Sequence, residues 1–147
     1  MMGRLFSVLI LGLLLSSCTP KTLDNNVFYL KGLSIPGETM QEKNGKYFFV
    51  ETYEELTSLI DSKVWLSEDD LKRLNQDFFE DKMIVFVYVH SSQGIKEVVA
   101  DTTLKGKTLK IHISVNSHYT MNLDARSVGI EIEKTKINKI DLYVEPS

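Results

Sequence analysis

Three histidines are the side chains of this sequence with the widest range of possible chemistry. His90 and His112 lie on predicted strands, and His118 lies in a predicted loop. If the two strands were neighbours, His90 and His112 could converge and, with Asp101 or Glu97, supply mixed ligands for zinc. The sequence contains no paired spacing such as H-E-x-x-H, and isolated histidines at a strand end, on a polar strand face and in a loop explain the pattern equally. We therefore predict no metal site.

A serine nucleophile and a calcium loop are two further chemistries to consider. Ser92 directly follows a predicted strand with His90 nearby, so a hydrolase that uses His90 with Asp101 or Ser92 is one hypothesis. A nucleophile elbow needs glycine two residues before and two residues after its serine, and Ser92 has Gly94 after it but His90 before it. The acidic residues around Asp69 and Asp81 lack the alternating oxygen ligands and the glycine of a calcium loop. We predict that the protein is not an enzyme and needs no cofactor.

Cys18 is the only cysteine in the chain, and an unusual segment precedes it. Arg4 is followed by an apolar run at positions 5–15, and two serines separate this run from Cys18. At about 1.5 Å per residue, such a run spans roughly 16 Å as a helix, about half of a ~30 Å hydrocarbon core. A basic residue, a short apolar stretch and small residues before a cleavage point are typical of an export signal.

Leu15-Ser16-Ser17-Cys18 resembles the lipobox of bacterial lipoproteins, in which the thiol is acylated and the preceding peptide bond is cut. The resemblance implies a signal peptide over residues 1–17 and a lipid on Cys18. It also implies an extracytoplasmic protein anchored to the bacterial cell membrane or outer membrane. Two alternatives remain open: an ordinary secretory signal that leaves Cys18 as a free thiol, and an uncleaved anchor or buried helix.

Composition limits the rest of the chain to one domain of ordinary size. Removal of residues 1–17 leaves 130 residues, enough for a single core. The formal charge of the whole chain is −3, and nucleic-acid binding depends on clustered basic charge, so we predict no nucleic-acid partner. Residues 18–26 are mostly polar and are predicted to be a flexible tether, followed by a single β-rich domain over residues 27–147.

Two helices are predicted in the first half of this domain. Thr52 and Glu55 form a capping box that opens one helix. Ser67 caps a second helix whose buried side is predicted to be Leu71, Leu74 and Phe78. Asn44-Gly45 is predicted to be the two-residue turn of a hairpin between residues 39–43 and 46–50.

The second half of the domain is predicted to be a sheet. Residues 83–89 are apolar at every position, as in a central strand covered on both faces. Alternation of apolar and polar residues over 109–115, 128–133 and 140–144 predicts further strands with one exposed face. The predicted class is α+β, strand-rich, with one mostly antiparallel meander over residues 83–145 and two short helices packed on one face.

The order of elements over residues 52–145 resembles the PrcB-like family of small exported lipoproteins, named for a subunit that stabilises a protease complex. The residues that carry the resemblance are the YEELTSLI helix, the phrase Asp77-Phe78-Phe79 before the strand Met83–Phe86, and the closing strand Ile140–Val144. The family tends to carry Thr-Gly-Gly-Tyr after its central strand, where this chain has Ser92-Gln93-Gly94-Ile95. The resemblance implies an exported protease as a partner.

These observations favour a lipid-anchored, non-catalytic domain that binds a protein or peptide in the cell envelope. The predicted contacts lie in two loops, 91–96 and 116–126, with Ser92, Gln93, Gly94, His118 and Tyr119 as candidates. The alternative is a lipoprotein that binds or senses a small ligand in a pocket between helices and sheet. The hydrolase hypothesis ranks last.

Overall fold

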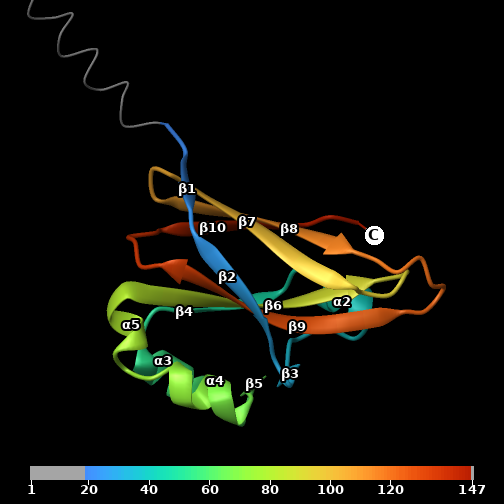
Figure 1. Ribbon diagram of the computed structural model, residues 1–147, viewed down its shortest axis with the longest axis horizontal. Coiled ribbons are helices and arrows are strands. Elements are labelled where there is room, and N and C mark those ends of the chain that lie inside the picture. Colours follow the sequence, from blue (N-terminus) through green and yellow to red (C-terminus); the bar gives the residue numbers. More distant parts are fainter. Residues whose placement is uncertain (1–18, 147) are drawn as a thin grey trace, which may run out of the picture.

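Two four-stranded sheets dominate the fold (Figure 1). The computed structural model describes residues 19–146; the predicted signal peptide and Cys18 lie outside the described residues. The first sheet has the strand order β1 (Lys21–Leu23), β7 (Glu97–Lys105), β8 (Thr108–Asn116), β10 (Lys139–Val144). The second sheet has the order β2 (Asn25–Tyr29), β9 (Asp124–Glu133), β6 (Lys82–Ser91), β4 (Tyr47–Val50). A small ribbon pairs β3 (Gly32–Leu33) with β5 (Val64–Trp65).

The predicted strand-rich α+β class is confirmed, but the predicted single meander is wrong. β6 pairs with β9 rather than with β7, and β10 pairs in parallel with β8. The chain therefore changes sheets after β6, before β9 and again before β10. Alternating apolar residues fix which face of a strand is buried, but they do not select its neighbour.

The predicted tether over residues 18–26 is also wrong in part. Residues 21–23 form β1, and residues 25–26 begin β2. Leu23 is 3% exposed within the core. Its carbonyl accepts a hydrogen bond from Thr102 Oγ1 at 2.7 Å, and Asn25 Nδ2 donates to the carbonyl of Ala100 at 2.9 Å. The chain crosses from the first sheet to the second at Asp24 and closes one side of the sandwich.

The helices agree with the predicted caps and differ in extent. The capping box of Thr52 and Glu55 begins α3 (Tyr53–Leu59), and Ser67 caps α4 (Glu68–Arg73), as predicted. The second helix ends at Arg73, however, and Phe78 belongs to a separate helix, α5 (Phe78–Asp81). Leu71 was predicted to be buried but is 42% exposed, whereas Leu74 is buried as predicted. Residues 40–43 form α2 (Met40–Lys43), opened by a Thr39–Glu42 capping box, so the predicted hairpin does not exist. A capping box satisfies the free N–H groups of a helix and outweighs the turn preference of Asn44-Gly45.

The second sheet is the middle layer of three. Strand β6 is buried on both faces, as predicted for residues 83–89. One face of this sheet packs against the first sheet through Val85, Ile111 and Ile130, and the other packs Ile84 and Phe86 against α3 and α5 through Leu56 and Phe79. Figure 1 shows α3, α4 and α5 together on the side of the second sheet opposite the first sheet.

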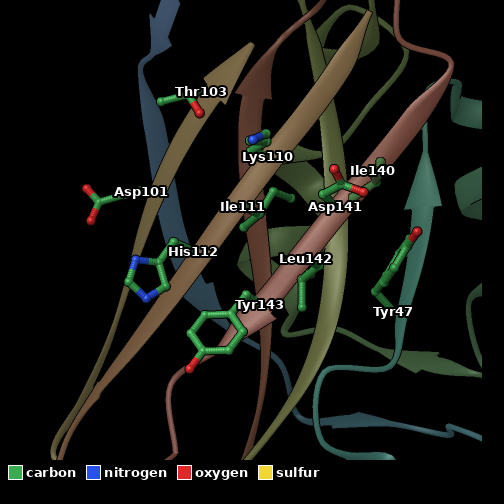
Figure 2. A pocket seen from close by; sticks show the side chains of 10 residues that line it. All are labelled: Tyr47, Asp101, Thr103, Lys110, Ile111, His112, Ile140, Asp141, Leu142 and Tyr143. Carbon is green, nitrogen blue, oxygen red and sulfur yellow. The ribbon is translucent and has the colours of Figure 1, made fainter. Parts of the chain in front are cut away.

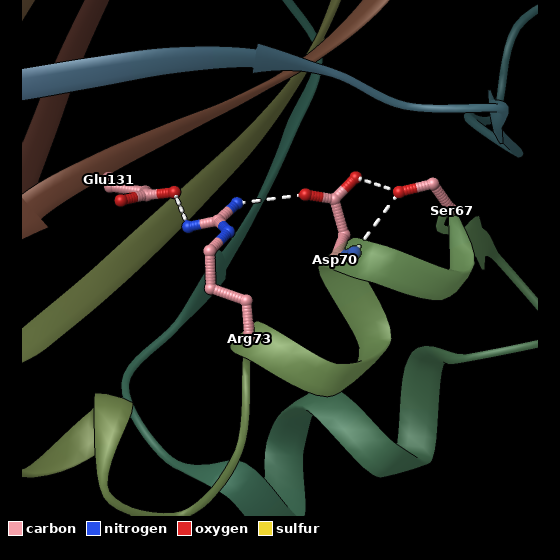
Figure 3. Close-up of polar contacts among 4 residues, drawn as sticks. All are labelled: Ser67, Asp70, Arg73 and Glu131. Atoms are coloured by element: carbon pink, nitrogen blue, oxygen red, sulfur yellow. Dashed lines mark hydrogen bonds and ion pairs between the residues drawn. The ribbon is translucent and has the colours of Figure 1, made fainter.

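An ion pair connects the helical layer to this sheet (Figure 3). The Arg73 guanidinium contacts the carboxylate of Glu131, a residue that is almost buried. The same guanidinium lies 2.9 Å from Asp70 Oδ1. Asp70 also accepts a 2.6 Å hydrogen bond from Ser67 Oγ. Burial alone would raise the pKa of Asp70, but the hydrogen bonds from Ser67 and Arg73 and the charge of Arg73 outweigh it, so the pKa is lowered.

Candidate functional site

The histidines and their proposed partners are dispersed. His90 lies on β6 in the second sheet, where its backbone N–H donates to Asn44 Oδ1 at 2.8 Å. His112 lies on β8 in the first sheet, with Asp101 as its cross-strand partner. His90 therefore has neither His112 nor Asp101 on a neighbouring strand. Within residues 19–146, no group of three His, Cys, Asp or Glu side chains could hold a metal ion.

His112 is part of a polar row on the exposed face of the first sheet. Its Nε2 lies 3.1 Å from Glu145 Oε1, and its ring centroid lies 5.4 Å from that of Tyr143. This row borders a groove of about 690 Å³ that reaches the edge strand β4 (Figure 2). The groove is lined by Tyr47, Asp101, Thr103, Lys110, Ile111, His112, Ile140, Asp141, Leu142 and Tyr143.

This groove does not lie between the helices and the sheet, where the sequence predicted a ligand pocket. Phe86, Leu56 and Leu74, which are at most 1% exposed, belong to the core under the helices. The groove instead runs over the outer face of the first sheet, because β10 and β4 are edge strands on the same side of the sandwich.

The two loops predicted to contact a partner are brought together. The backbone N–H of Thr120 donates to the carbonyl of Gln93 at 3.1 Å, and the Thr120 hydroxyl donates to the same oxygen at 3.2 Å. Ser117 Oγ donates to Gln93 Oε1 at 3.2 Å. Ser92 and Gln93, which are exposed, thus lie in one surface with the loop that carries His118 and Tyr119. Gly94, also predicted to contact a partner, is instead buried beneath this surface, where it packs against Thr120. We call residues 91–96 and 117–123 the contact loops.

The base of the contact loops is fixed by the strands that lead into them. Asp124, the first residue of β9, accepts a hydrogen bond from the Ile95 N–H at 3.0 Å and pairs with Arg126 at 2.9 Å. Gly94 has a φ of +75°, and a Cβ there would lie 2.7 Å from Thr120 Oγ1. Only glycine therefore permits this approach of the two loops without displacement.

The tip of the second contact loop is the most exposed apolar feature among residues 19–146. Tyr119 is 89% exposed, Met121 is 102% exposed and Leu123 is 68% exposed. Sequence analysis identified Tyr119 but missed Met121 and Leu123. Tyr119, Met121 and Leu123 alternate with polar residues in a segment rich in Ser, Thr and Asn. This pattern could have indicated an exposed apolar loop, but it is also typical of a strand.

The described residues define an α+β domain of two packed sheets that presents a pair of joined loops. No family model matches this chain, and comparisons with curated proteins and with solved structures find no match either. The resemblance to the PrcB-like family stays a prediction. Within residues 19–146, no helix has the length and apolar character needed to cross a membrane.

Proposed function

We propose that this protein is a lipid-anchored accessory domain of the bacterial cell envelope that binds another protein through its contact loops. The observation that carries the proposal is the tip formed by Tyr119, Met121 and Leu123. Large apolar side chains exposed together on a polar rim are typical of protein-binding surfaces, where aromatic residues and Met are enriched. An exported protease is the partner class that the PrcB-like resemblance favours.

The bonding beneath the tip supports a binding role. Gln93 receives three hydrogen bonds from Ser117 and Thr120, and Asp124 holds both loops at their base. A loop that is ordered before it meets its partner loses less conformational entropy on binding. The same bonds join the loop that carries the apolar tip to the exposed Gln93, so a partner would contact both loops together.

The position of the tip suits a protein held by Cys18. β1 begins at Lys21, which is paired with Leu104 at one end of β7, whereas Glu97 at the other end is paired with Asn116, directly before the tip loop. At about 3.3 Å per residue, the eight steps from Lys105 to Glu97 separate these ends by roughly 26 Å. Lipid on Cys18 would therefore leave the tip facing away from the bilayer.

Site-specific photocrosslinking in the producing cells tests this proposal. A photoreactive residue at Met121 should capture a discrete envelope protein, whereas the same residue at Met40, which is 42% exposed on α2, should not. Replacement of Tyr119 and Leu123 by Ser should abolish capture at position 121 without changing the melting temperature. Capture of lipid alone, or equal capture at both positions, would refute a protein-binding tip.

A small-ligand-binding role is the second candidate, favoured by the groove beside Tyr143. Its volume of about 690 Å³ lies within the usual range for ligand pockets, roughly 300–1,000 Å³. A ligand that binds the native state must raise the melting temperature with concentration. In a thermal-shift screen, Tyr143→Ser should remove any such shift, and Tyr119→Ser, which changes an 89% exposed tyrosine outside the groove, should retain it.

A further inference from the structure

A cluster of lysines occupies the end of the first sheet at which the chain enters the domain. We call it the basic end: Lys21, Lys105, Lys107, Lys136 and Lys139. Strand register brings these residues together, because Lys21 pairs with Leu104, and Lys105 and Lys139 both pair with Thr108. The β7–β8 turn and the β9–β10 loop are joined by a 2.8 Å hydrogen bond from the Asn138 N–H to the Lys107 carbonyl.

Most of this positive charge is not neutralised. Lys105, Lys107 and Lys136 are exposed and make no ion pair among the described residues. Lys139 pairs with Asp141 at 2.6 Å, and Lys21 lies 3.9 Å from Glu133. Three positive charges without an ion pair therefore remain at the end of β7 and on the two joined loops.

The acidic residues at this end of the molecule lie beside the second sheet instead. Asp24, Glu80, Asp81 and Glu133 line one hollow there together with Lys82 and Lys134. The first sheet therefore carries the positive side of this end, and the second sheet and α5 carry the acidic side. Positive and negative side chains are therefore separated at this end of the molecule, even though the formal charge of the chain is −3.

The basic end lies close to the proposed lipid attachment point. Cys18 precedes Lys21 by three residues, which span at most about 11 Å when extended. The Debye length is about 8–10 Å at physiological ionic strength. An acylated Cys18 would therefore hold Lys21, and through its pairing with Leu104 the end of β7 that carries Lys105, near a bilayer surface whose charge acts over this range.

We propose that the basic end is a docking surface for anionic lipid headgroups. This inference rests on the proposed anchoring through Cys18, and it specifies how the domain stands on the membrane. Lys105, Lys107 and Lys136 face the headgroups, the acidic hollow tilts away from them, and the contact loops point outward. A lipid chain together with a basic surface holds a protein more firmly than a single chain does.

Chemical anchoring tests docking separately from lipidation in the cell. In a chain beginning at Cys18, which retains all described residues, the single thiol is coupled to maleimide lipid in vesicles. Amide hydrogen exchange is then compared on neutral phosphatidylcholine vesicles and on vesicles that also contain phosphatidylglycerol. On the anionic vesicles, exchange at residues 105–107 and 134–138 should slow about threefold or more, and exchange at 117–123 should not change. About 0.5 M NaCl should remove the difference, because it shortens the Debye length.

Two charge-matched variants decide the outcome. Lys105→Gln/Lys107→Gln/Lys136→Gln should lose the slowing, whereas Lys31→Gln/Lys46→Gln/Lys72→Gln, which removes the same charge at exposed positions elsewhere, should retain it. Equal exchange on both vesicle types, or equal loss in both variants, would overturn the docking surface. Because the maleimide replaces any acyl group, this result is independent of whether the cell lipidates Cys18.

Discussion

Arg73 is the side chain that most directly connects the helical layer to the central sheet. It contacts the almost buried Glu131 on β9, and its guanidinium carbon lies 4.9 Å from the centre of the Phe28 ring. A buried carboxylate that loses its cation keeps the full cost of its desolvation. Removal of Arg73 alone should therefore destabilise the fold by more than the intact ion pair contributes to its stability.

Arg73→Met should lower the free energy of unfolding by about 2 kcal/mol, because Glu131 would remain buried without a partner. Arg73→Met/Glu131→Met should recover most of that loss, since two apolar side chains can replace a buried pair at little cost. Urea unfolding measures both variants, with Lys72→Met as the exposed control on the same helix. A double variant as unstable as the single one would contradict this explanation.

Asp70 should make the free energy of unfolding depend on pH in the acidic range. Its pKa is lowered in the folded protein from an ordinary value of 3.8, so its charged form stabilises the native state. This stabilisation is fully present above pH 3.8 and is lost as the pH falls through the lower folded pKa. The difference in melting temperature between the wild type and Asp70→Asn should therefore be largest near neutral pH and shrink below pH 3.8. A difference that is constant from pH 7 to pH 2.5 would argue against it.

At the scale of elements, β1 shows how a short polar-looking segment becomes structural. Only Leu23 in this strand is buried, yet it fills the core between the two sheets and its backbone pairs with Thr102. The residues around it gave no alternating pattern long enough to predict a strand.

Leu23→Ala should cost about 2–3 kcal/mol of unfolding free energy, a typical cost for a buried leucine. The flexible tether predicted from the sequence would instead allow this change without effect. Thr22→Ala is the matched control, because Thr22 is an exposed residue of the same strand. Calorimetric melting temperatures of the two variants distinguish these interpretations.

At the scale of the whole molecule, the two ends of the sandwich differ in chemistry. The basic end lies where the chain enters, and the apolar tip of the contact loops lies at the opposite end. The strands between them pack into two cores on either side of the second sheet. This arrangement suits a rigid spacer that presents a binding surface away from a membrane.

Cys18→Ser should release the protein from the membrane fraction without changing its melting temperature. Among residues 19–146, the first buried residue is Leu23, so we expect lipidation of Cys18 and folding of the domain to be separable. Fractionation of cells and thermal unfolding of the purified chain give the two readouts. Unchanged membrane association of the variant would contradict anchoring through this cysteine.

Features that depend only on neighbouring residues could be predicted from the sequence. Caps such as Thr52–Glu55 and Ser67 satisfy backbone groups within one turn, and the apolar run at 83–89 requires burial on both faces. These features are encoded locally, so they could be predicted without knowing the fold. The proximity of the two contact loops was not predicted, although their residues were.

Strand pairing and the contacts between loops could not be predicted, because they form only in the folded chain. The parallel pairing of β10 with β8, the crossing of β1–β2 between sheets and the contact of Gln93 with Thr120 all join residues distant in sequence. Several pairings bury the same alternating side chains, and the packing of both cores selects among them. The contact loops and the basic end depend on that selection, because each is assembled from segments that meet only in the folded chain.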